Sequence, residues 1–174
     1  MKIRLIAPEG LIPDAHTAAE AAVRGVEVLI IEHLRSKNDK TRPNRYGLPK
    51  SNYYAEAAKD VAASVDGNKI NVEIGYPGIS LHYEGGTVRP KPGKKALALP
   101  VDPSVAGIWP SDYDPTPKHE KTFVSPAGAI GDRDTGKILW ILLPHVEIPS
   151  DKTVLPADAA IFGAVEEALA EVVS

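Results

Sequence analysis

Apolar residues recur at helical spacing in three parts of the chain, and each part predicts an α-helix. The longest covers residues 15–34, where an apolar residue returns every three or four positions and Asp14 is the expected N-cap. Ser51 is expected to cap a shorter helix over residues 52–63. A C-terminal helix over residues 156–173 opens with a proline. Small residues fill the first half of the longest helix, so another backbone can approach it closely.

The remaining periodicity is the alternation of polar and apolar residues that is typical of β-strands. Residues 69–74 alternate most regularly, with their apolar members on one face. Residues 123–130 and 137–143 predict a hairpin, because turn-forming residues separate them. Residues 77–83 fit a single helical turn. Further extended segments are predicted at residues 2–6, 86–89, 96–101 and 146–148.

The order of these elements predicts an α+β fold. We expect an antiparallel sheet with a long N-terminal helix, a second short helix and a C-terminal helix packed on it. A length of 174 residues favours a single domain over residues 1–174. Residues 102–121 carry four prolines and no periodicity, which predicts a long loop or an extended arm. Such a segment has a function when it occurs in a compact domain, and we expect it to reach a neighbouring subunit.

The composition is that of an ordinary globular protein and excludes several kinds of site. There is no cysteine, which excludes disulfides, thiolate zinc sites and a cysteine nucleophile. The net charge of −3 argues against nucleic-acid binding by bulk charge. No apolar run approaches the roughly 20 residues of a membrane-spanning helix, and the first, residues 3–7, is too short for a signal peptide. We therefore expect a soluble protein or a member of a soluble assembly.

One stretch, residues 131–137, matches most of a phosphate-binding loop but fails in two respects. The position after the lysine should carry a hydroxyl and is Ile138, and a strand follows where a helix is required. The aspartates of the same turn lack the glycine and glutamate spacing of a calcium loop. No two histidines have the spacing of a helical metal pair. We therefore predict no catalytic residue, no cofactor and no metal, and a protein that is not an enzyme.

Half of the twenty lysines and arginines lie in two short segments. Residues 33–50 hold six of them against one acidic residue, and residues 89–95 hold four and no acidic residue. Tyr46, Tyr53 and Tyr54 accompany the first segment, and tyrosine is enriched at protein interfaces. Such segments are either solvated loops or surfaces that face DNA phosphates or an acidic protein. The candidate contact residues are Arg35, Lys37, Lys40, Arg42, Arg45, Arg89, Lys91, Lys94 and Lys95.

Several motifs follow one another in a recognisable order. Residues 82–100 carry an aromatic turn, a glycine pair, the turn T-V-R-P-K and the strand K-A-L-A-L-P. Residues 135–149 add a T-G-K turn and V-E-I-P before the closing helix. In this order they resemble the tail-completion or virion morphogenesis family of tailed bacteriophages, the minor tail protein Z-like proteins. Residues 150–153 depart from the aromatic-proline stretch of that family, and the segment over 102–121 is longer than in the family.

The resemblance implies a structural virion protein at the phage head–tail junction, in the neck or in tail completion. It implies a homo-oligomeric ring around the DNA channel, with neighbouring neck and tail proteins and packaged double-stranded DNA as partners and no membrane. Assembly would take place in the host cytoplasm. We expect the loop over residues 35–50 to face the channel and residues 89–95 to meet an acidic partner or adjacent subunit. Tail terminator, head–tail adaptor and stand-alone binding module are the alternatives.

Overall fold

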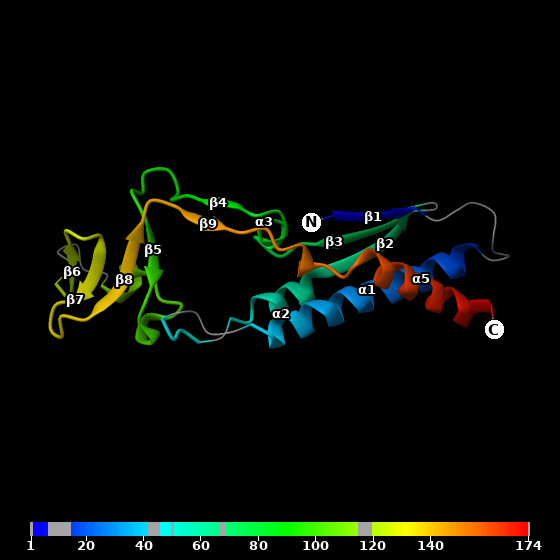
Figure 1. Ribbon diagram of the computed structural model, residues 1–174, viewed down its shortest axis with the longest axis horizontal. Helices are drawn as coiled ribbons and strands as arrows, with labels where there is room; N and C mark the ends of the chain where they lie inside the picture. Colours follow the sequence, from blue (N-terminus) through cyan, green and yellow to red (C-terminus); the bar gives the residue numbers. More distant parts are fainter. Residues whose placement is uncertain are drawn as a thin grey trace. The chain divides into compact units, whose positions relative to one another are not determined.

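A computed structural model describes residues 2–6, 15–41, 46–49, 51–66, 69–114 and 120–173. The fold is α+β, with a long N-terminal helix, a C-terminal helix and antiparallel sheets, as predicted (Figure 1). Where the sequence predicts a single domain, the chain forms two compact units, and no described residue belongs to both hydrophobic clusters. Unit 1 comprises Met1–Thr41, Asn52–Gly85 and Pro149–Ser174, and unit 2 comprises Arg42–Ser51 and Gly86–Ile148.

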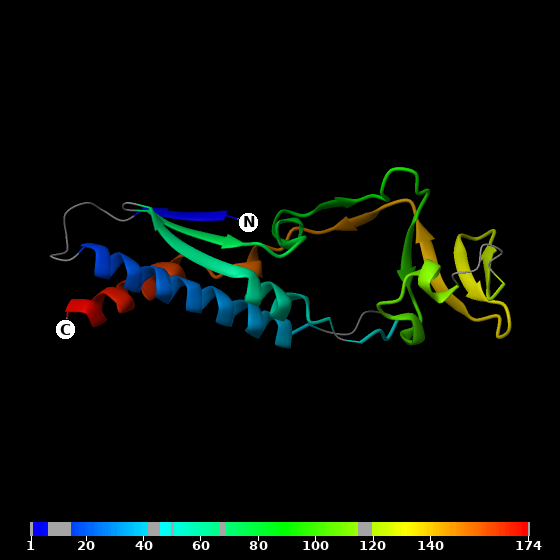
Figure 2. The same cartoon turned by 180° about the vertical axis from the view of Figure 1, so that it is seen from behind.

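The two long helices of unit 1 lie side by side (Figures 1 and 2). They are α1 (Ala15–Asp39) and α5 (Asp158–Val173). They are in close contact at Gly25, where a Cβ atom would lie 3.0 Å from the Ala164 carbonyl oxygen and 3.2 Å from the Ala168 Cβ. The small residues of α1 therefore admit a helix of the same chain.

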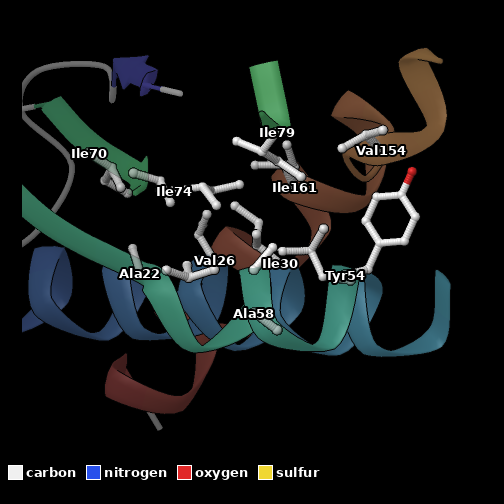
Figure 3. Packing of buried hydrophobic residues seen from close by; sticks show 14 residues of the cluster. Ala22, Val26, Ile30, Tyr54, Ala58, Ile70, Ile74, Ile79, Val154 and Ile161 are labelled. Carbon is white, nitrogen blue, oxygen red and sulfur yellow. The ribbon is translucent and has the colours of Figure 1, made fainter. Parts of the chain in front are cut away.

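One face of α1 forms the floor of the unit 1 core. Buried residues recur at every fourth position along it, which keeps them on one side of a helix. Figure 3 shows Val26 and Ile30 of this face beside Ile74 and Ile161, which come from a strand and from α5. The buried positions of α1 are Ala18, Ala22, Val26, Ile30, Leu34 and Asn38.

The sheet of unit 1 has three antiparallel strands in the order β1-β3-β2. They are β1 (Lys2–Ile6), β2 (Val61–Asp66) and β3 (Lys69–Ile74). The bounds of β1 and β3 agree with the prediction. The predicted apolar face of β3 points into the core, with its three members Ile70, Val72 and Ile74 all buried.

The predicted helix over residues 52–63 is wrong in its last three residues. α2 (Tyr53–Ala57) and the 3-10 helix η1 (Ala58–Asp60) are helical, but β2 follows at once. Asn52 rather than Ser51 occupies the N-cap, and its side chain makes no capping hydrogen bond. β2 pairs with β3 over its whole length and carries β-branched side chains at its first and fifth positions. Strand pairing therefore outweighs the local helical pattern.

Two short helical segments cover the other end of the same core. α3 (Ile79–Glu84) confirms the helical turn predicted near residues 77–83. The 3-10 helix η3 (Lys152–Val154) precedes α5 and is held against α3 by main-chain and side-chain hydrogen bonds. Ile79 and Val154 are fully buried and belong to the same hydrophobic cluster as the α1 face (Figure 3).

Unit 2 contains a two-stranded ribbon and a four-stranded antiparallel sheet. In the ribbon, β4 (Gly86–Val88) pairs with β9 (Val146–Ile148). The larger sheet has the order β5-β8-β7-β6. A turn divides the predicted strand over residues 123–130 into two strands, whereas the β7–β8 hairpin is confirmed. The four strands are β5 (Leu97–Pro100), β6 (Thr122–Ser125), β7 (Ala129–Asp132) and β8 (Ile138–Leu143).

Residues 102–114 fold within unit 2, so the expectation of an extended arm is wrong for them. The 3-10 helix η2 (Pro103–Val105) and the short helix α4 (Pro110–Tyr113) interrupt the segment. Val105 is fully buried in a cluster with Trp140. The segment therefore belongs to the unit 2 core, because the Val105 side chain in the middle of it is buried.

A buried carboxylate fixes the end of this segment to the start of β6. Asp114 is 1% exposed and accepts hydrogen bonds from the backbone N–H groups of Lys121, at 3.1 Å, and Thr122, at 3.0 Å. The Thr122 hydroxyl donates a third bond at 2.9 Å. A buried carboxylate needs such donors because desolvation of its charge is costly. Residues 115–119 of the predicted arm lie outside the described residues.

Candidate functional site

The first basic segment is not one loop. α1 continues through Asp39, so Arg35 and Lys37 lie on its last two turns and not in a loop. The helix extends this far because Leu34 and Asn38 keep its buried face facing the core. The sequence contains no helix-breaking residue between positions 34 and 41 that would have ended it earlier.

The other predicted cations of this segment are placed differently. Arg35 and Lys40 are exposed at the C-terminal end of α1 and just beyond it. Their positive charge is favourable there because the helix dipole is negative at this end. Arg42, Arg45 and Lys50 lie outside the described residues.

Lys37 is held inside unit 1. Its Nζ atom lies 2.8 Å from Asp151 Oδ2 and 2.8 Å from Thr153 Oγ1, and 5.4 Å from the centre of the Tyr54 ring. The Lys37 hydrogen bond and then that of the Thr153 hydroxyl lower the pKa of Asp151 to about 2. His33 Nε2 lies 2.9 Å from the carbonyl oxygen of Thr153, which belongs to the same η3 segment. Lys37 therefore joins α1 to η3, and only 18% of its side chain is exposed.

Two tyrosines that the sequence suggested for an interface belong to the unit 1 core and its margin. Tyr54 is 8% exposed. Tyr53 packs on His82 with ring centres 4.6 Å apart and on Tyr76 at 5.1 Å, and its hydroxyl donates to the Pro77 carbonyl at 3.0 Å. Burial raises the pKa of Tyr53 to about 12 and lowers the pKa of His82. At neutral pH this aromatic cluster is therefore uncharged.

The second basic segment, residues 89–95, is called the basic turn from here on. Its four cations, Arg89, Lys91, Lys94 and Lys95, are all exposed. None of them forms an ion pair with a carboxylate in the described parts of the chain. The Lys94 N–H donates to the Lys91 carbonyl at 3.0 Å, and Gly93 takes a φ of +82° that closes the turn. Among the residues that the structure describes, the basic turn is the predicted set that lies together on a surface.

Two exposed apolar residues were not predicted as functional. Trp109 is 67% exposed and Ile108 is 40% exposed, both in the segment before α4 in unit 2. An exposed tryptophan is uncommon and marks a candidate contact residue. The sequence signal was available, because Ile108 and Trp109 are adjacent bulky apolar residues in a stretch without periodicity.

The turn over residues 133–137 is a structural hairpin turn, as its sequence predicted. Asp132 Oδ1 accepts from the Thr135 N–H and hydroxyl, both at 2.8 Å, and Gly136 has a φ of +68°. Lys137, which would contact a phosphate in a phosphate-binding loop, pairs with Asp102. That ion pair and the Ser104 hydrogen bonds lower the pKa of Asp102 to about 2.

The described residues contain neither a metal-binding cluster nor a membrane-spanning helix. No group of three or more histidine, aspartate or glutamate side chains within these residues is arranged to hold a metal ion. No helix in the same residues has the length and apolarity to cross a membrane. Comparisons of the chain with protein-family models, with curated proteins and with solved structures give no match.

Proposed function

We propose that this chain is a structural virion protein of a tailed bacteriophage, located at the head–tail junction. Copies of it form a ring around the DNA channel and join the neck to the tail. The basic turn is the observation that carries this proposal, since it presents four exposed cations without a carboxylate partner among the described residues. The motif order over residues 82–100 and 135–149, which resembles the tail-completion family, also supports it.

In this function the chain binds and does not catalyse. Contacts of lysine and arginine with DNA phosphates carry no base information, so the DNA would be bound without sequence preference. A single subunit of net charge −3 binds DNA weakly. A ring multiplies weak contacts because its sites are held at high effective concentration.

The two basic segments have different roles in the proposal. The end of α1 and the residues after it face the channel, through Arg35, Lys40, Arg42 and Arg45. Lys37 does not face the channel in this proposal, because its ammonium group donates hydrogen bonds to Asp151 and Thr153. The basic turn meets an adjacent subunit or an acidic neck protein.

Tail terminator and head–tail adaptor are the alternative positions for such a ring, and a stand-alone nucleic-acid- or protein-binding module is the alternative without one. Mass measurement by light scattering separates these classes. A module remains monomeric over a wide concentration range, whereas a ring component shows a large homomeric species or binds a preformed partner ring. Electron microscopy of the large species then shows whether it has a central channel.

The proposal as a whole is tested in phage particles. Particles assembled without this protein should have filled heads that lose DNA or lack attached tails. Substitution of Arg35, Lys40, Arg42 and Arg45 by glutamine should leave particle composition unchanged and lower DNA retention. Absence of the protein from purified wild-type particles would contradict the virion assignment, and normal retention in the substituted particles would contradict the channel assignment alone.

A further inference from the structure

An open groove of about 390 Å³ runs beside the contact between α1 and α5 in unit 1. Gly25, Ala164 and Ala168 line it where the two helices are in contact, so its floor includes small residues. Val28 lines it as well, and its side chain is 47% exposed. An apolar residue in this position leaves the groove able to cover the stem of a long side chain.

The rim of this groove is acidic. Glu32 from α1 and Glu167 and Glu171 from α5 line it together with one cation, Arg24, which gives a net charge of −2. All four side chains belong to exposed residues. The small floor and the acidic rim together suit a cationic side chain with an apolar stem, and lysine has this character.

The basic turn has the complementary properties. It carries four cations and no acidic residue over residues 89–95, a net charge of +4. Pro90 and Pro92 restrict its backbone, so little conformational entropy is lost when it is bound. Three of its cations are lysines, whose stems can cover Val28 and the alanines while their ammonium groups reach the rim carboxylates.

We propose that the basic turn of one copy binds the α1–α5 groove of a second copy of this chain. This inference rests on the proposed ring and names the contact that closes it. The turn belongs to unit 2 and the groove to unit 1, so each copy supplies one turn and one groove. Such a head-to-tail contact repeats from copy to copy and closes into a ring when the rotation allows.

The charges of the basic turn and of the groove favour a second copy of the chain over DNA as the binding partner. DNA would use the basic turn and leave the acidic groove without a role, whereas a second copy uses both. The contact is electrostatic and solvent-exposed, so the association should weaken as salt is raised. One turn in one groove is a small interface, and ring closure is required to make the assembly persistent.

The test reverses each surface in turn in the full-length chain. The turn variant carries Lys91→Glu, Lys94→Glu and Lys95→Glu, which changes the net charge of the turn from +4 to −2. The groove variant carries Glu32→Lys and Glu167→Lys, which changes the net charge of the rim from −2 to +2. In each variant alone, like charges meet, and we expect the dissociation constant between copies to rise about 100-fold.

Mixing the two variants again pairs surfaces of opposite charge in both possible contacts. The reversed turn of one variant then faces the reversed groove of the other, and the two unreversed surfaces face each other. We expect the equimolar mixture to associate as the wild type does, measured by analytical ultracentrifugation at low salt. Glu166→Lys is the matched control for the groove, since Glu166 is exposed on α5 and does not line it. Lys121→Glu is the control for the turn.

Folding of each variant is checked by circular dichroism, and every substituted residue is exposed. Variants that associate like the wild type would overturn the inferred contact and leave the ring proposal intact. A mixture that stays monomeric while the wild type associates would also overturn it. A wild type that is monomeric at every concentration overturns the contact. If the protein is also absent from phage particles, the proposed function fails with it.

Discussion

Asp151 joins three segments of unit 1 through its backbone and its carboxylate. Its Oδ2 atom accepts from Lys37 Nζ at 2.8 Å, and its Oδ1 atom accepts from the Thr153 hydroxyl at 2.6 Å. Its own N–H donates to the His82 carbonyl at 3.0 Å. Asp151 therefore connects α1, α3 and η3. Its protonation should lower the stability of unit 1.

We therefore expect unit 1 to lose stability in acid through Asp151. Folding lowers the pKa of this carboxylate from 3.8 to about 2, so its contribution is complete above pH 3.8 and is lost as pH falls through about 2. Asp151→Asn should lower the free energy of unfolding at neutral pH by about 0.5–1 kcal/mol, because the carboxylate is 41% exposed and solvent screens the pair. Urea unfolding at several pH values measures both effects.

The difference between the wild type and Asp151→Asn should shrink as pH falls from 4 towards 2. Asp134→Asn, on an exposed turn of unit 2, is the control and should leave the unfolding of unit 1 unchanged. A pH-independent difference would mean that Asp151 acts through its shape and backbone and that its charge contributes nothing.

At the scale of elements, the α1–α5 contact depends on a glycine. At Gly25 an added methyl group would meet a backbone carbonyl at 3.0 Å, and a backbone atom cannot turn aside. At Gly163 in α5, nothing lies within 4 Å of the corresponding position. The same substitution should therefore have different outcomes on the two helices.

Gly163→Ala should raise the free energy of unfolding by about 1 kcal/mol, the helix-propensity difference between glycine and alanine. Gly25→Ala should gain nothing, because α1 and α5 must separate by a few tenths of an ångström. Gly25→Leu should destabilise by about 1–3 kcal/mol through overpacking. Urea unfolding followed by far-UV circular dichroism measures all three, and wild-type stability in Gly25→Leu would show that the two helices do not pack in solution.

The segment before β6 offers a second test at this scale. Val105 is fully buried and Trp109 is 67% exposed, although both lie in the stretch that the sequence predicted to be a loop or arm. Val105→Ala should lower the free energy of unfolding of unit 2 by about 2 kcal/mol, and Trp109→Ala should leave it within about 0.5 kcal/mol. Equal effects of the two substitutions would mean that the segment does not pack as described.

The whole molecule should unfold in two steps. The hydrophobic clusters of unit 1 and unit 2 share no described residue. Both tryptophans, Trp109 and Trp140, belong to unit 2, whereas the two longest helices belong to unit 1. Tryptophan fluorescence therefore reports on unit 2, and far-UV circular dichroism reports mainly on unit 1.

We expect these two signals to give different urea midpoints, since independent cores need not unfold together. Ile30→Ala, in the unit 1 core, should lower the free energy of unfolding measured by circular dichroism by about 3 kcal/mol. It should leave the fluorescence transition at its wild-type midpoint. Coincident transitions in the wild type and a common shift in Ile30→Ala would show that the chain unfolds as one cooperative domain.

Local patterns predicted much of this structure. Helical spacing placed α1 and α5, and strict alternation placed β1 and β3 with their observed bounds. The turn chemistry around Asp132 identified the β7–β8 hairpin and excluded a phosphate-binding loop. These elements could be predicted because the signal lies within a few neighbouring residues, and the basic turn was visible for the same reason.

The sequence by itself determined the two long helices, the strands β1 and β3, the absence of cysteine and the two clusters of positive charge. Only the tertiary structure decided that β4 pairs with β9 across nearly sixty residues, and that Lys37 and Tyr54 are held inside unit 1. It also decided that residues 61–66 form a strand and that Val105 is buried. Each of these outcomes depends on a partner distant in the chain, and local propensity carries no information about which distant segment will supply it.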